Sequence, residues 1–210
     1  MLDEALLVSF AVTLFSMMNP VGNVALFAGL TARQSPAESR RVARSCAIAS
    51  AITLLVVAWG GDAILKFFGI SVDALRAAGG LIVLTIGMNM LSNRNDHKHS
   101  ENEDRDAAQR QSIAIVPLAI PIVAGPGAMV AVLVSARQHT HFMGKVEISG
   151  VIIAMSVVVW LFFNSAPVIN KRLGASGMGV VTRVMGMLLI AIAMGMMAQG
   201  LRGLLPGLDK

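Results

Sequence analysis

Two short motifs place proline, glycine and asparagine in the middle of long apolar stretches. The first reads Met18-Asn19-Pro20-Val21-Gly22-Asn23, and the second reads Val123-Ala124-Gly125-Pro126-Gly127-Ala128. Proline removes a backbone donor and glycine lets the chain leave helical geometry cheaply, so each motif predicts a break in a helix. A broken helix offers free amides that attract a carboxylate and free carbonyls that attract a cation. Two opposed breaks would therefore suit a zwitterion such as an α-amino acid.

The predicted binding residues are those of the two motifs together with one nearby hydroxyl. They are Ser16, Asn19, Pro20, Gly22, Asn23, Gly125, Pro126 and Gly127. Two alternatives stay open at this point. The breaks could be kinks that serve packing alone, and each polar side chain could do no more than form a hydrogen bond between helices.

Other reactive side chains do not assemble into a catalytic or metal site. The pairs His97/His99 and His139/His141 resemble four ligands, but the topology derived below puts them on opposite sides of a membrane. Cys46 is the single cysteine and has no neighbouring base to activate it. We therefore expect no enzyme activity, no cofactor and no bound metal.

The carboxylates lie outside the apolar stretches. Proton-coupled carriers often hold a carboxylate inside the membrane, so its absence weakens that mechanism. Asp62 and Asp73 are expected at the surface, in a connection between two membrane segments.

The composition indicates an integral membrane protein. The chain is 55% apolar and 14% charged, with a mean hydropathy of +0.71, whereas soluble domains carry roughly 25% charged residues. The formal net charge of +5 does not indicate a nucleic-acid partner, because the basic residues lie in short connections between apolar windows. Trp59 and Trp160 could anchor the chain at the two membrane surfaces.

Six windows contain no Asp, Glu, Lys or Arg, and each reaches the lower limit of roughly 17 residues for a membrane-spanning helix. The windows are Ala5 to Ala32, Ser45 to Gly61, Ala77 to Asn93, Gln111 to Ala136, Ile148 to Asn170 and Val184 to Leu201. The fold class predicted is an all-α polytopic membrane protein with six transmembrane segments. The first and fourth windows are the longest and carry the Pro/Gly motifs, so segments 1 and 4 are predicted to be broken there.

The second half of the chain echoes the first. Thr31 to Gln34 returns as Ser135 to Gln138, Phe68 to Ser71 as Leu173 to Ser176, and Arg76 to Leu81 as Arg183 to Leu188. Three segments per repeat is an odd number, so the second repeat enters the membrane from the opposite side, as in several secondary transporters. The expected units are residues 1–91, a polar linker at 92–112, and residues 113–210. Arg76 and Arg183 take equivalent positions, as interfacial anchors or as gate residues.

The distribution of basic residues predicts the orientation. Connections after segments one, three and five carry eleven Lys and Arg residues, against six on the other side. The positive-inside rule places the richer side in the cytoplasm and both termini outside. The polar stretch Ser92 to Arg110 is then a flexible cytoplasmic linker, with a regulatory role left open.

Several stretches resemble the MarC family of bacterial integral membrane proteins, and within it the YchE-like members. They are NPVGN at Asn19 to Asn23, FGIS at Phe68 to Ser71, RAAGG at Arg76 to Gly80, VPLAIPIVAGPGA at Val116 to Ala128 and TRVMGMLL at Thr182 to Leu189. The resemblance implies a six-segment protein of the inner membrane, related to archaeal neutral amino-acid transporters. It also implies that the two break motifs form the substrate site.

The function expected is secondary transport of small neutral amino acids, with the substrate held between the two breaks. The rivals are a non-transporting membrane protein, such as an assembly or stress-response partner, and a channel. The expected partners are the lipid bilayer and a small substrate, with no nucleic acid and with homo-oligomerisation left open.

Overall fold

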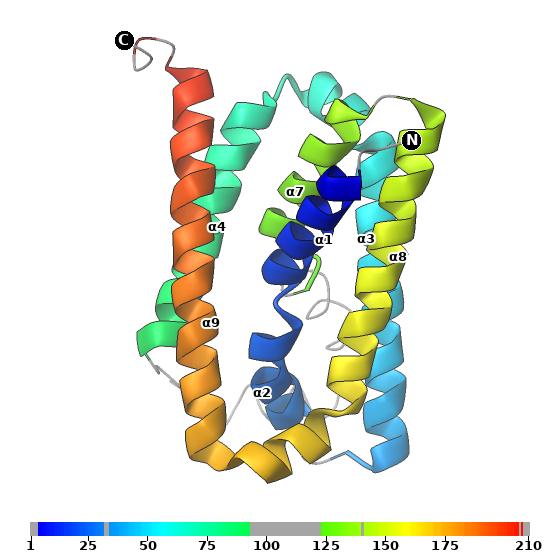
Figure 1. The fold of residues 1–210 in the computed structure, drawn as a ribbon, viewed down its shortest axis with the longest axis vertical. Coiled ribbons are helices and arrows are strands. Elements are labelled where there is room, and N and C mark those ends of the chain that lie inside the picture. Colours follow the sequence, from blue (N-terminus) through cyan, green and yellow to red (C-terminus); the bar gives the residue numbers. More distant parts are fainter. Residues whose placement is uncertain (1–3, 32–33, 93–122, 140, 206, 208–210) are drawn as a thin grey trace.

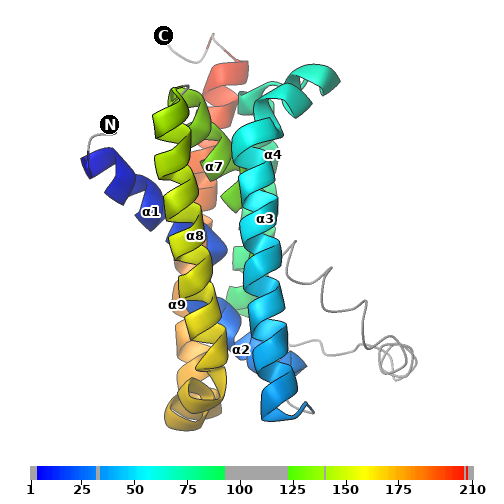
Figure 2. The ribbon, with the colours of Figure 1, turned by 90° about the vertical axis from the view of Figure 1, so that its right-hand side faces the viewer.

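The computed structural model describes residues 4–31, 34–92, 123–139, 141–205 and 207, and helices dominate this part of the chain. The helices stand side by side in one upright bundle (Figures 1 and 2). In chain order they are α1 (Glu4–Met18), α2 (Pro20–Leu30), α3 (Pro36–Phe68), α4 (Val72–Ser92), α7 (Pro126–Gln138), α8 (Phe142–Asn164) and α9 (Ala166–Leu204). The described chain begins and ends at the same end of the bundle, at the top of Figure 1, which we call the termini end.

Five stretches within the described residues are long and apolar enough to cross a membrane. They are Ala5–Val24, Pro36–Phe68, Val72–Ser92, Phe142–Asn164 and Ser176–Leu204. These stretches overlap five of the six predicted windows and confirm a helical polytopic membrane protein. The fourth window, Gln111 to Ala136, is described only from Val123 onward, where α7 has 13 residues. Its first half lies outside the described residues, as do the linker from Asn93 to Arg110 and the pair His97/His99.

The charge-free windows are shorter than the helices that contain them. The second window was expected to run from Ser45 to Gly61, but α3 begins at Pro36 and ends at Phe68. Ser35 caps its start, because its side chain accepts a hydrogen bond from the amide of Glu38 while Glu38 bonds back to the amide of Ser35. Asp62 therefore lies within α3, which corrects its predicted place in a connection.

The fifth window is also corrected by the structure. It was expected to form one segment from Ile148 to Asn170, but α8 ends at Asn164 and α9 begins at Ala166. Charge alone cannot reveal this junction, because no charged residue marks it. The first part of α9 crosses the far end of the bundle in Figure 1, and at Gly174 the backbone leaves helical geometry, with φ 64° and ψ 179°.

Three helices of the first half each pack against an antiparallel helix of the second half. The pairs are α1 with α7, α3 with α8, and α4 with α9 (Figure 1). Glycines bring α4 and α9 together, since a Cβ atom on Gly87 would lie 2.9 Å from the Gly186 carbonyl oxygen, and one on Gly80 would lie 2.9 Å from that of Ala193. Close approach through small residues is the usual way in which membrane helices associate.

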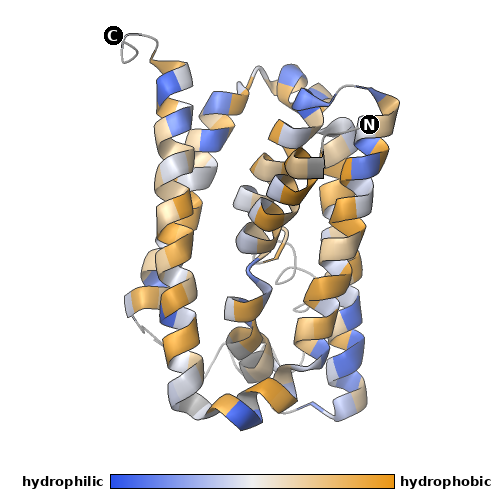
Figure 3. Cartoon of the chain, viewed as in Figure 1, coloured by the Kyte–Doolittle hydropathy of each residue, from blue (hydrophilic) through white to orange (hydrophobic). Residues whose placement is uncertain are grey.

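Apolar side chains fill both the inside and the outside of the bundle. Large side chains that are fully buried include Leu14, Met18, Leu54, Val132, Leu133, Ile148, Ile152 and Val159. Others are exposed along the outer helix faces, among them Val8, Val12, Ile52, Val56, Ile153, Val157, Val180 and Met187. Polar residues gather towards the two ends, as Figure 3 shows by colour. This distribution suits a bilayer, in which lipid solvates the outer apolar faces.

Two glycines have similar positive φ angles, and both belong to stretches that the sequence echoes. Gly69, with φ 65°, ends α3, and Gly174, with φ 64°, lies within α9. They are the glycines of the echoed stretches Phe68 to Ser71 and Leu173 to Ser176. Residues with a side chain rarely adopt such angles, so both positions favour glycine for the same backbone reason.

Candidate functional site

The helix of the first window is interrupted at Asn19, between α1 and α2. Asn19 has a φ angle of 44°, which is unusual for a residue with a side chain and most tolerable for Asn or Asp. Pro20 opens α2, at a position where its missing N–H costs nothing. The Asn19 side-chain oxygen accepts a hydrogen bond from the amide of Gly22 at 3.1 Å. Asn19 is thus the N-cap of α2, and it is 3% exposed.

Asn23 closes the other side of this interruption. Its side-chain amide donates to the carbonyl of Met18 at 3.1 Å, so it satisfies the end of α1. The hydroxyl of Ser16 donates to the carbonyl of Val12 at 2.9 Å, within the same helix. The polar atoms predicted to meet a ligand at this motif therefore bond to the backbone next to them.

The second motif lies at the start of α7 and is capped differently. Gly125 is the N-cap, Pro126 is the first helical residue, and no side chain caps this end. The first helical bond runs from the amide of Met129 to the carbonyl of Gly125 at 3.0 Å. The amides of Gly127 and Ala128 precede that bond and have no partner in the helical ladder. Both residues are buried.

The two motifs approach each other near the middle of the bundle. A Cβ atom added to Gly127 would lie 2.7 Å from the sulfur of Met17, which is in the last turn of α1. The same atom would lie 2.7 Å from a methyl carbon of Val83 on α4. Only glycine leaves room for this contact between the end of α1 and the start of α7. The structure therefore brings together two elements that the sequence predicted to be neighbours.

A pocket of about 440 Å³ extends from this contact towards the termini end, and we call it the upper pocket. It lies between α1, α7 and α9, and Arg76 of α4 also lines it. Its polar lining consists of Ser9, Thr13, Arg76, Ser135, Gln138, His139 and Gln199. Its apolar lining includes Leu6, Phe10, Met17, Val130, Val134, Ile192 and Met196. Volumes of about 300–1,000 Å³ are typical of small-molecule sites.

Hydrogen bonds already made within the pocket define what its groups can still offer. Thr13 donates its hydroxyl proton to the carbonyl of Ser9 at 2.9 Å, which leaves the lone pairs of its oxygen free. The Nδ1 atom of His139 lies 2.8 Å from the carbonyl of Ser135, so Nδ1 carries the proton and Nε2 is the acceptor in the neutral ring. Arg76 is 20% exposed and lies 3.3 Å from Asp73.

An ion pair near the pocket mouth joins the two halves of the chain. The guanidinium of Arg137 on α7 contacts Asp62 on α3, with nitrogen–oxygen distances of 2.5 and 2.6 Å. Lys66 also contacts Asp62, at 2.8 Å. Asp62 and Arg137 are each about 40% exposed, in agreement with the expected surface location of Asp62.

The predicted site residues take different places relative to this pocket. Gly127 lines it, and Gly125 and Pro126 lie directly before Gly127. Asn19, Pro20 and Gly22 are buried beside the interruption, and the Asn19 side chain faces Met90 of α4, with 3.7 Å between its amide nitrogen and the sulfur.

The hydroxyls of Ser9 and Thr13 were missed by the sequence analysis. They lie one turn apart in a window that also holds Met17, so the spacing places all three on one helix face. That spacing was the available signal. His139 was considered only as a metal ligand, whereas in the structure it lines the pocket.

A family model described as "MarC family integral membrane protein" matches residues 5–205. The chain belongs to the MarC family. It is 35% identical to the UPF0056 membrane protein YhcE of Escherichia coli, over 95% of this chain and 93% of that protein. It is 35% identical to the UPF0056 membrane protein YvbG of Bacillus subtilis, over 95% of each.

An archaeal MarC family relative is similarly close. The UPF0056 membrane protein MJ1677 of Methanocaldococcus jannaschii is 36% identical over 92% of this chain and 94% of its own length. The names of these relatives describe a membrane protein and mention no substrate. No solved structure matches the chain.

Proposed function

We propose that this protein is a secondary transporter of small neutral amino acids and that the upper pocket is the way to its substrate site. One observation carries the proposal: the uncapped start of α7 meets the end of α1 at the foot of a partly polar pocket. The pocket volume of about 440 Å³ suits a small molecule. The proposal assigns no catalytic step, cofactor or metal to the chain.

The chemistry of this site suits a zwitterion. The free amides of Gly127 and Ala128, at the positive end of the α7 dipole, can receive a carboxylate. The oxygen lone pairs of Thr13 and the amide oxygen of Gln199 can receive an ammonium group. Asn19 and Asn23 act on this site indirectly, because their hydrogen bonds hold the interruption that brings Met17 against Gly127.

We further propose that the fold is an inverted repeat of two three-segment halves, with segments 1 and 4 broken at the two motifs. The antiparallel packing of α1 on α7, α3 on α8 and α4 on α9 supports it. So does the equivalence of Gly69 and Gly174, whose φ angles are 65° and 64°. In repeats of this kind the substrate site lies near the repeat interface at mid-depth, which is where the two motifs meet.

We propose the bacterial inner membrane as the location, with both termini in the periplasm. The bias of basic residues towards the other end of the bundle supports this orientation. The upper pocket then opens towards the periplasm. A homo-oligomer is compatible with the proposal and is not needed for it.

Uptake into proteoliposomes tests the proposal. Purified protein is reconstituted, and uptake of labelled glycine, alanine and serine is measured with and without the same amino acid inside the vesicles. A transporter gives saturable uptake that internal amino acid accelerates. Uptake that rises linearly with concentration would instead indicate a channel. Absence of uptake above protein-free vesicles, for folded protein, would favour the non-transporting rival.

A matched pair of variants connects uptake to the pocket. Thr13→Val removes the hydroxyl and keeps the shape of the side chain, and we expect at least a tenfold loss of uptake, or about 1.4 kcal/mol. Thr85→Val is the control, because the exposed Thr85 hydroxyl also donates to a carbonyl four residues earlier, at 3.0 Å. Equal uptake by both variants would remove Thr13 from the site.

A further inference from the structure

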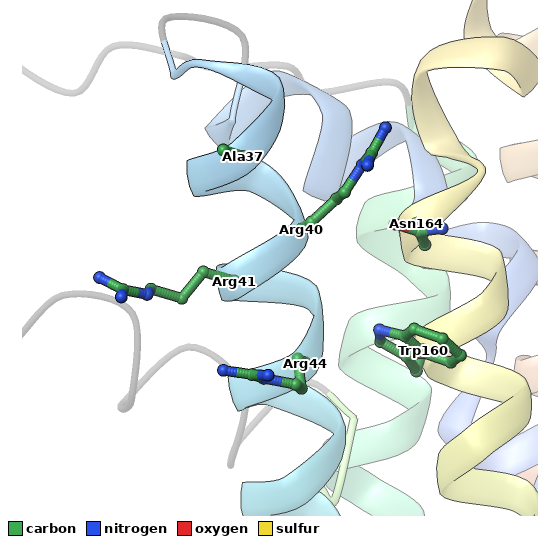
Figure 4. Close-up of a pocket in the computed structure, with 6 residues that line it drawn as sticks. All are labelled: Ala37, Arg40, Arg41, Arg44, Trp160 and Asn164. Atoms are coloured by element: carbon green, nitrogen blue, oxygen red, sulfur yellow. The ribbon is translucent and has the colours of Figure 1, made fainter.

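Three arginines gather in the first turns of α3, at the end of the bundle opposite the termini. Arg40, Arg41 and Arg44, together with Ala37, follow the helical spacing of three and four residues and therefore form one stripe. All three arginines are exposed. Between this stripe and α8 lies a pocket of about 430 Å³, lined by Ala37, Arg40, Arg41, Arg44, Trp160 and Asn164 (Figure 4). We call it the arginine pocket.

The positive charge of this pocket is balanced only in part within the described residues. None of the three guanidinium groups forms an ion pair with a described carboxylate, and Glu38, in the first turn of α3, interacts electrostatically with Arg41 alone. Arg40 and Arg44 are one turn apart and repel each other, and cations in the first turns of a helix are also disfavoured by its dipole. The arrangement therefore favours an anion in the pocket.

The donors lining the pocket suit a phosphate group. A guanidinium presents several N–H donors in a plane and often binds phosphate through two of them at once. In Figure 4, Arg40 extends to the side of α8, whereas Arg41 and Arg44 extend away from α8. Asn164 adds an amide that can donate, and Trp160 adds an indole N–H. The two sides of the pocket thus present donors of different kinds around one space.

The depth of the pocket in the membrane indicates where such a phosphate comes from. Arg44 directly precedes the charge-free window that begins at Ser45. The guanidinium groups therefore lie at the level of lipid headgroups, and tryptophan is enriched at the same level. Basic pockets between membrane helices are typical places for anionic lipid headgroups.

We propose that the arginine pocket binds a phosphate group, supplied by the headgroup of an anionic phospholipid held between α3 and α8. The site is separate from the upper pocket, which lies towards the other end of the bundle. The proposal does not depend on transport.

Lipid retention by the full chain tests this. The protein is purified in a neutral detergent, incubated with phosphatidylglycerol or with phosphatidylcholine, and examined by native mass spectrometry. We expect phosphatidylglycerol to be retained at least fivefold more than phosphatidylcholine. The double variant Arg40→Gln/Arg44→Gln should abolish that preference.

The matched control removes two charges from the same end of the bundle. Lys171 and Arg172 are exposed in the first turns of α9 and do not line the pocket. Lys171→Gln/Arg172→Gln should keep the preference for phosphatidylglycerol. If both double variants lose it equally, general surface charge explains the binding and the proposal is wrong. Equal retention of both lipids by the wild type would also overturn it.

Two further measurements complete the test. In the first, binding of inorganic phosphate is measured in the wild type and in the Arg40→Gln/Arg44→Gln variant. If the wild type binds phosphate, the variant does not, and neither retains phosphatidylglycerol, the phosphate site is supported and its ligand is a soluble anion. Arg40→Lys/Arg44→Lys keeps the charge and removes the planar donors, so retention should fall to an intermediate level. If the glutamine double variant does not fold, Arg40→Gln alone is measured, and unchanged retention in it overturns the proposal.

Discussion

Asn19 combines a φ angle of 44° with a capping hydrogen bond to the amide of Gly22. Asn19→Ala should lower the free energy of unfolding by about 2 kcal/mol, because it leaves a buried amide without a partner and makes the positive φ more costly. Asn19→Gly tolerates the φ angle but lacks the cap, so we expect a smaller loss. Denaturation in detergent measures both. A stability of Asn19→Ala equal to the wild type would show that the cap contributes nothing.

Gly127 allows the two motifs to touch, and this gives a second prediction. In Gly127→Ala the new methyl group would lie 2.7 Å from the Met17 sulfur and 2.7 Å from a methyl carbon of Val83, so these side chains or their helices must shift. We expect uptake to fall at least tenfold, with a loss of about 1–3 kcal/mol in stability. Gly150→Ala is the control, since its Cβ would meet nothing within 4 Å. Its stability should be unchanged or higher by up to about 1 kcal/mol. Wild-type uptake by Gly127→Ala would argue against a site at this contact.

At this scale the sequence predicted that the first apolar window is interrupted, but not how the residues there are arranged. The Pro and Gly residues indicated an interruption, and Asn19 and Asn23 lie beside it. Asn19 caps the amide of Gly22 and Asn23 caps the carbonyl of Met18. Both bonds depend on the backbone angle at Asn19 and on the single residue that separates the end of α1 from the start of α2. Residue spacing does not reveal those geometric details.

The contact between α3 and α7 near the termini end includes an ion pair of Asp62 and Arg137, with nitrogen–oxygen distances of 2.5 and 2.6 Å. Because both side chains are about 40% exposed, we expect a coupling energy of only about 0.2–1 kcal/mol. A double-mutant cycle of Asp62→Asn and Arg137→Gln measures it, and raising the salt concentration should reduce it. The same cycle with Lys66→Gln separates the lysine contact. A coupling energy above about 3 kcal/mol would mean that the pair is more buried than the structure shows.

Element boundaries were the least predictable part of the fold. Windows without charge mark the apolar section of a helix, but α3 continues through charged turns at both ends because its caps, Ser35 and Gly69, lie beyond them. The junction of α8 and α9 at Ser165 contains no charge and no glycine, and its readable signal was Ser165 followed by Pro167 in the first turn of α9. The Ser35/Glu38 spacing was a readable signal for the start of α3.

Both ends of the described chain lie at one end of the bundle, and α4 runs away from that end (Figure 1). Reporter fusions at Lys210 and at Ser100 should therefore report opposite compartments, with Ser100 in the cytoplasm. Alkaline phosphatase and a fluorescent protein, active on opposite sides of the membrane, provide the readout. Reports from the same compartment would contradict an odd number of membrane segments between Ser100 and Lys210.

Of the predictions from sequence, the internal repeat concerns the largest part of the molecule. Echoed residues paired Phe68 to Ser71 with Leu173 to Ser176, and the glycines of these stretches share a positive φ angle. The sequence could not show that α4 and α9 touch through Gly87 and Gly186. That contact arises from the three-dimensional arrangement of the halves.

Gly69 and Gly174 have a mechanical consequence. Gly69 joins α3 to α4 at the termini end, and Gly174 joins the crossing part of α9 to its upright part at the far end (Figure 1). The packed pair α4/α9 is thus connected to its neighbours through a glycine with a positive φ angle at each end. If the backbone angles of both glycines change, the α4/α9 pair can tilt as a rigid body. When it tilts, one end of the bundle must widen as the other narrows.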